Sequence, residues 1–179
     1  MKTKKQQELV ETLLSTLSQE EKALYWDIAL YLSALGYNPK KEGQRISFKH
    51  DRHNKQIAKM GLTRGKTPSP VFKLRFSACH TYSQKFSDIV QRIAVTARSD
   101  AWGAVSGGCL NGECNFCAGA PETHLYQFTH PNGATTYACG AQALDIPNIT
   151  AEDVVEIKHL LKEEHIYLMK HQAGIAVEE

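Results

Sequence analysis

VFKLRFSA, residues 71–78, alternates apolar and polar side chains in the pattern of a half-buried β-strand. Phe72, Leu74 and Phe76 are expected to face the core, and Lys73 and Arg75 are expected to face solvent. A strand with one solvated face is typical of an antiparallel sheet. This stretch therefore predicts a sheet that is covered on one side only.

Hairpin signals lie on both sides of this strand. Residues 46–48 alternate with basic neighbours, and a polar turn at 51–54 separates them from a second strand over 57–62. Further along, LYQFTH and ATTYAC flank Pro131-Asn132-Gly133, and Asn-Gly is a strong hairpin signal. With Asn132 and Gly133 as the two turn residues, Tyr126 pairs with Cys139. Cys139 would then lie at the open end of the hairpin.

Helical spacing of apolar residues predicts helices over 4–17, 18–35, from about 83 to 97, and from Thr150 onward. Ser18 and Glu21 form a capping-box pattern, and Gly36 and Pro39 end that helix. We expect one α+β domain over 1–179, with an antiparallel sheet of about five strands and helices on one face. Its basic part spans 1–75, and a Cys-rich metal-binding lobe at the base of the second hairpin spans about 103–140.

The composition is that of a globular protein, with 42% hydrophobic and 22% charged residues among 179. No secretory pattern follows Met1, and the longest apolar run, 23–35, is interrupted by Asp27 and is too short to span a bilayer. We therefore expect a cytoplasmic protein without a membrane partner. Because a reducing cytosol does not maintain disulfides, the five cysteines favour metal binding.

Four of the cysteines have the spacing of a metal site: Cys109-x4-Cys114-x2-Cys117-x21-Cys139. A C-x2-C pair places two thiolates on one ion, and zinc takes four such ligands in a tetrahedron. The hairpin brings Cys139 back toward the loop, with His124 close enough to be an additional metal-proximal residue. A closed four-cysteine zinc site has no open coordination position, so it would be structural.

The loop also resembles that of plant-type ferredoxins, which hold a two-iron two-sulfur cluster with C-x4-C-x2-C and a distant fourth cysteine. The resemblance covers about eleven residues and implies electron transfer through the same four cysteines. Asn115 and Phe116 differ from the small residues of that family, and the gap to Cys139 is shorter. Zinc is the favoured cofactor, and the cluster is the alternative.

Positive charge is concentrated in the first half of the chain. Residues 1–75 contain 15 Lys and Arg against 7 Asp and Glu, whereas residues 76–179 contain 6 against 12. A basic sheet face could attract an anionic small molecule or nucleic acid. An ordinary solvated face, or pairing with the acidic half, are the other interpretations. The candidate residues are Lys49, Arg52, Lys55, Lys59, Arg64, Lys66, Lys73 and Arg75.

Two further features of the sequence bear on possible chemistry. Cys79 lies between a strand and a helix, where a thiol can become nucleophilic, so a thiol enzyme is a third hypothesis. His50 and His53 lie in a polar turn and are expected at the surface. Nucleotide-binding and hydrolase motifs are missing from the sequence. The sequence therefore favours a non-catalytic zinc-binding domain that recognises an anionic ligand or nucleic acid.

Overall fold

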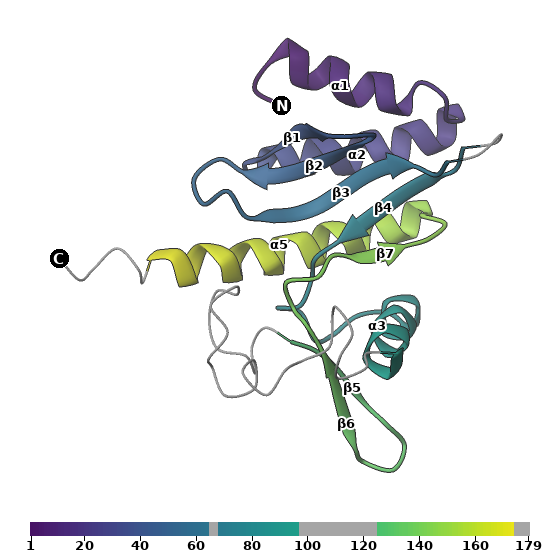
Figure 1. Cartoon of the computed structure of the whole chain (residues 1–179), viewed down its shortest axis with the longest axis vertical. Coiled ribbons are helices and arrows are strands. Elements are labelled where there is room, and N and C mark those ends of the chain that lie inside the picture. Colours follow the sequence, from purple (N-terminus) through teal and green to yellow (C-terminus); the bar gives the residue numbers. More distant parts are fainter. Residues whose placement is uncertain (65–67, 97–124, 174–179) are drawn as a thin grey trace. The chain divides into compact units, whose positions relative to one another are not determined.

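The computed structural model describes residues 1–64, 68–96 and 125–173 (Figure 1). The chain divides into two compact units. Unit 1 comprises Met1–Leu74 and Asp145–Lys162, and unit 2 comprises Arg75–Leu144 and Glu163–Glu179. The expectation of one domain over 1–179 stays a prediction.

Unit 1 combines a sheet with helices. Its helices are α1 (Lys4–Leu14), α2 (Gln19–Ala34) and the beginning of α5 (Ala151–Ala173). The five-stranded sheet has the order β1-β2-β3-β4-β7. Its strands are β1 (Tyr37–Glu42), β2 (Arg45–His50), β3 (Gln56–Leu62), β4 (Pro70–Leu74) and β7 (Leu144–Ile146).

Local sequence signals fix the two N-terminal helices. Thr3 caps α1 and Ser18 caps α2, each in a complete capping box with the third helical residue. These bonds satisfy backbone amides that the first turn of a helix leaves without a partner. After α2, Gly36 takes a φ of 92°, which lets the chain reverse directly into β1.

The antiparallel sheet confirms the α+β expectation. β1, β2, β3 and β4 pair antiparallel in sequence order. β1 was not predicted from the sequence. Its Pro39 is tolerated because β1 is an edge strand. Strand β4 ends at Leu74, shorter than the expected 71–78.

One face of this sheet forms the core of unit 1. Ile46, Phe48, Met60, Phe72 and Leu74 are at most 2% exposed. They alternate with Lys49, Lys59 and Lys73 along the strands, as the pattern predicts. Helix α2 lies against the buried face (Figure 1), and the ring of its Tyr25 meets Phe72 edge-on at 6.4 Å. The opposite face of the sheet carries the basic side chains.

Unit 2 is built around a second, separate hairpin. It contains α3 (Gln84–Thr96), β5 (Tyr126–Thr129), β6 (Thr135–Ala138) and the last part of α5. Phe76, which is fully buried, meets the rings of Tyr82, Phe86 and Tyr126 edge-on at 5.1–5.7 Å. Helix α3 packs against this hairpin (Figure 1). The second hairpin therefore forms its own two-stranded sheet.

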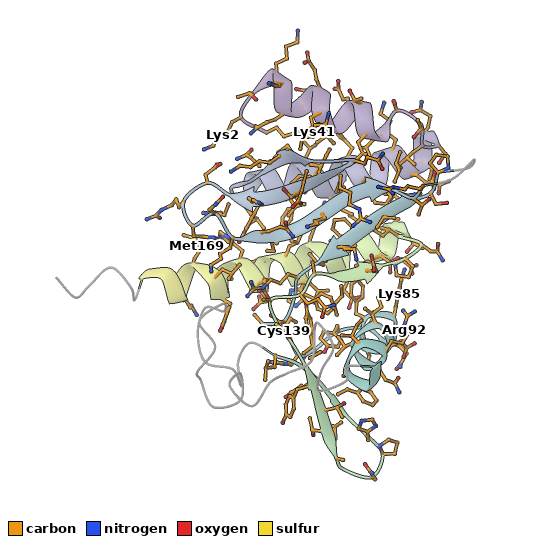
Figure 2. All side chains as sticks on the ribbon, in the orientation of Figure 1. Lys2, Lys41, Lys85, Arg92, Cys139 and Met169 are labelled. Carbon is orange, nitrogen blue, oxygen red and sulfur yellow. The ribbon has the colours of Figure 1, made fainter. Side chains whose placement is uncertain are left out.

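The predicted register of this hairpin is wrong by one residue. Tyr126 pairs with Ala138, not with Cys139. The loop is longer than two residues, since His130 N–H donates to the Ala134 carbonyl and Gly133 takes a φ of 82°. A one-residue shift moves every side chain of a strand to the other face. Cys139 still follows β6 directly, at the end of the hairpin away from its tip (Figure 2).

Candidate functional site

The solvent face of the unit 1 sheet carries a row of side chains that crosses four strands. Lys40, Ser47, Lys59 and Lys73 are successive register partners on β1, β2, β3 and β4. Lys49 lies in the next row along, paired with Asn38 on β1. We call Lys40, Arg45, Lys49, Lys59 and Lys73 the basic face.

Two members of the basic face already have acidic partners. Lys59 Nζ lies 3.1 Å from Glu42 Oε2, and Lys73 Nζ lies 2.9 Å from Asp145 Oδ2. Like charges directly opposite each other destabilise a sheet, so these carboxylates offset the Lys59–Lys73 pairing. Both lysines are partly exposed, which makes each ion pair weak. Lys59 and Lys73 would therefore attract an anion less strongly than lysines without a carboxylate partner.

A less neutralised group of bases lies at the β2–β3 turn. Lys49, Arg52 and Lys55 have no ion-pair partner among the described residues. The carboxylate of Asp51 is occupied by Lys2 Nζ and Asn38 Nδ2, both at 2.7 Å. The hydrogen bond from Lys2 is the main reason that the pKa of Asp51 is lowered. We call Lys49, Arg52 and Lys55 the turn bases.

The prediction of a surface position for His50 is wrong. This residue is 5% exposed, and its ring stacks on His53 with centroids 4.1 Å apart. Burial lowers the pKa of His50, although the nearby Asp51 charge opposes the shift. Gly36 makes the burial feasible, because a Cβ there would lie 2.8 Å from His50 Nε2. The two stacked histidine rings thus pack beneath the β2–β3 turn.

Backbone amides of this turn are used internally. Arg52 N–H donates to His50 Nδ1 at 3.2 Å, and Lys55 N–H donates to His53 Nδ1 at 3.1 Å. Asn54 N–H donates to the His50 carbonyl at 2.9 Å. Small phosphates are often held by convergent backbone amides, and these amides are not oriented for that role. Anion recognition here would depend on the long basic side chains.

The expectation that Arg75 faces solvent is wrong, so Arg75 does not belong to the basic face. Its side chain is buried, and its Nε forms an ion pair with Glu164, which is 0% exposed. Among the other predicted bases, Arg64 Nε donates to Gln44 at 3.3 Å, and Lys66 lies outside the described residues.

The predicted metal site falls mostly outside the described residues. Cys109, Cys114, Cys117 and His124 lie in 97–124. Cys139 is described and half-buried, and its carbonyl accepts the N–H of Gln142 in a tight turn. The described residues contain no group of three metal-ligating side chains. The four-cysteine site therefore stays a prediction for which Cys139 is the visible member.

A buried hydrogen-bond network surrounds the turn that begins at Cys139. The Tyr126 hydroxyl accepts from Phe76 N–H at 3.0 Å and donates to the Gln142 carbonyl at 2.9 Å. Ser77 Oγ donates to the Gly140 carbonyl at 2.9 Å. Because a serine hydroxyl has one hydrogen, its 3.4 Å contact with Glu164 Oε2 is secondary.

Glu164 completes this network from α5. Its Oε2 accepts Ala78 N–H at 2.9 Å while Oε1 contacts Arg75. Burial raises the pKa of Tyr126 well above its ordinary value, and the charge of Glu164 adds to the effect. The Tyr126 phenol therefore keeps its proton and remains a donor to Gln142. Sequence reasoning missed these residues because they are far apart along the chain.

Cys79 has the environment of a packed thiol. It is 7% exposed, and its Sγ lies 3.3 Å from the Thr81 carbonyl oxygen, to which it donates. Donation to a carbonyl favours the protonated thiol, whereas a nucleophile must be an accessible thiolate. This geometry favours a structural role for Cys79 over the thiol-enzyme hypothesis.

A hollow of about 250 Å³ lies in unit 1. Glu11, Gln19, Lys22, Ala23 and Trp26 line it, so it contains none of the predicted site residues. Small-molecule sites are usually concave, with polar groups that converge on the ligand.

None of the helices in the described residues is long and apolar enough to cross a membrane.

Comparisons with protein-family models, with curated proteins and with solved structures found no match to this chain.

Proposed function

We propose that this chain is a non-catalytic recognition domain that binds an extended polyanion, such as a nucleic-acid backbone, through the basic face and the turn bases of unit 1. The observation that carries the proposal is the charge imbalance at the β2–β3 turn. Lys49, Arg52 and Lys55 are accompanied there by the Asp51 carboxylate, which Lys2 and Asn38 already occupy. Positive side chains of this kind release counterions from a polyanion when they bind it.

The form of the site favours a long anion over a small one. The basic side chains extend from several strands, and the nearby turn amides are satisfied internally. A small metabolite needs convergent donors in a cavity, whereas a phosphate backbone needs only repeated positive charges.

Base stacking is not part of this proposal. Phe48 and Phe72, the aromatic residues of β2 and β4, are fully buried on the core face. Single-strand binding proteins usually present such rings to the bases. Recognition through charge alone would not discriminate between nucleotide sequences.

The test is fluorescence anisotropy of a labelled oligonucleotide across a salt series. Each phosphate contact contributes about 0.7–0.9 to the log–log salt slope, so K49Q/R52Q/K55Q should reduce the slope by about 2–3. The matched control is K5Q/K22Q/K162Q, which removes the same charge from the helices of unit 1. If both variants lost the same amount of slope, binding would depend on net charge and not on the turn bases, which would contradict the proposed site. No salt-sensitive binding by the unaltered chain would refute the proposal.

The second part of the proposal is a structural zinc held by Cys109, Cys114, Cys117 and Cys139. Its support is the cysteine spacing together with the position of Cys139 directly after β6. Elemental analysis of the purified chain should find one zinc per chain and no visible absorption. Iron with labile sulfide and a brown colour would replace zinc with the two-iron cluster.

A further inference from the structure

Two arginines lie at the end of the unit 1 sheet opposite to the turn bases. Strand β2 begins at Arg45, directly after the β1–β2 turn, and the β2–β3 turn follows its last residue, His50. Arg64 follows β3 and reaches the same end, where its Nε donates to Gln44 Oε1 at 3.3 Å. Arg45 and Arg64 are both exposed, and neither has an ion-pair partner among the described residues. We call Arg45 and Arg64 the arginine pair.

The side chain of Arg45 is positioned by the neighbouring strand. Gly61 of β3, its register partner, is buried, and a Cβ there would lie 2.7 Å from Arg45 Cγ. The aliphatic part of Arg45 therefore lies against Gly61, in space that the side chain of any other residue would need. Glu42, the register partner of Arg45 on β1, directs its carboxylate to Lys59 Nζ at 3.1 Å. The guanidinium of Arg45 can therefore still donate to an anion.

Arg64 is positioned by Gln44, the residue that precedes Arg45 in the chain. The hydrogen bond to Gln44 uses Nε, so the terminal nitrogens of Arg64 can still donate to a ligand. Guanidinium groups present their donors in a rigid fork that matches a phosphate group, whereas a lysine offers a single charged point. Two arginines at one end of the sheet therefore favour phosphate as the ligand.

The distance along β2 defines the length of the ligand. Arg45 and Lys49 lie on the same face of this strand, about 13 Å apart at about 3.3 Å per residue. The lysines of the row between them, Lys59 and Lys73, are paired with carboxylates. One phosphate group cannot contact both ends of the sheet, whereas a chain of phosphates can.

We propose that the arginine pair is a second phosphate subsite, with Gly61 and Gln44 as positioning residues. The inference rests on the proposed function and adds to it a second point of contact. A polyanion bound at both ends would lie along β2, from the turn bases to the arginine pair.

The experiment is fluorescence anisotropy of a labelled single-stranded oligonucleotide with the full chain, across a salt series. R45K/R64K keeps both charges and removes both forks. Loss of one hydrogen bond typically weakens binding about 2- to 10-fold, so this variant should bind about 5- to 100-fold more weakly. Its salt slope should be unchanged, because the slope reports the number of charges that contact phosphates.

R45Q/R64Q also removes the charges, and it should lower the salt slope by about 1.4–1.8. The matched control is K5Q/K41Q, which removes the same charge away from the basic face. Lys5 lies on α1, and Lys41 shares the core side of the sheet with its register partner Ile46. An equal loss of slope in this control would overturn the subsite.

Gly61→Ala tests the position of Arg45 without any change of charge. Gly61 does not have a positive φ, so alanine fits the strand, but the added Cβ displaces the Arg45 side chain. This variant should bind about 2- to 10-fold more weakly with an unchanged salt slope, and circular dichroism checks that it is folded. Unaltered affinity of Gly61→Ala would overturn the positioning role of Gly61.

The outcomes separate this inference from the proposed function. Unaltered affinity of R45K/R64K, with binding that still depends on the turn bases, would overturn the arginine subsite and leave the proposed function intact. No salt-sensitive binding by the unaltered chain would overturn the proposed function and this inference with it.

Discussion

The buried ion pair between Arg75 and Glu164 makes Glu164→Gln a sharp test of unit 2. Glu164 is 0% exposed and Arg75 is 4% exposed, so neither charge has water as an alternative partner. A glutamine can still accept the N–H of Ala78, but it removes the carboxylate charge that Arg75 Nε contacts. Removal of one partner from a buried pair costs about 3–5 kcal/mol. We expect a loss of that size in the free energy of unfolding.

Urea denaturation followed by circular dichroism measures this loss. With an m-value of about 2 kcal/mol per molar urea, the midpoint should fall by about 1.5–2.5 M. The control is R75M/E164L, which removes both charges while keeping similar volume. It also loses the bond from Ala78 and the longer contact from Ser77 to Glu164. Replacing both members of a buried pair is far less costly than removing one, so this variant should lose less than half as much. A loss below about 1 kcal/mol for Glu164→Gln would refute the reasoning, because the Arg75 charge would then be compensated elsewhere.

Two more outcomes follow from the packing around His50. Gly36→Ala should lower the urea midpoint more than Gly43→Ala. Both glycines have a positive φ, but only at Gly36 would an added Cβ lie 2.8 Å from the His50 ring. Equal losses of stability in the two variants would mean that His50 is not tightly packed against Gly36. Since burial lowers the pKa of His50, its contribution to stability is full above pH 6.5 and declines as the pH falls toward its native pKa. The urea midpoint should therefore be lower at pH 5 than at pH 7.5, with a smaller difference in His50→Gln, and an unchanged difference would contradict this account. Asp51, whose pKa is also lowered, acts in a separate window below pH 3.8.

The sequence predicted the elements whose pattern is local. Alternation identified β2, β3 and β4, and the capping box at Ser18 identified the start of α2. β1 was missed because its YNPKKE sequence has no apolar alternation. Its conformation is imposed by pairing with β2, which a local pattern does not contain.

Sequence reasoning about the site failed mainly because it did not predict which polar side chains are buried. Arg75 fits the alternation of a solvent-facing base, yet Glu164, far along the chain, makes it part of a buried pair. His50 looks like a turn residue, yet Gly36 opens the space that buries it. The hairpin register depended on whether the loop had two residues or three, and the Asn-Gly signal allows both.

The most direct test of the basic face is hydrogen exchange of the full chain with and without a saturating single-stranded oligonucleotide. We expect slower exchange at residues 49–55 and along β3, with exchange on the outward surfaces of α2 and α5 unchanged. Protection on those helices, or no protection anywhere, would contradict the assignment of polyanion binding to the turn bases and the basic face.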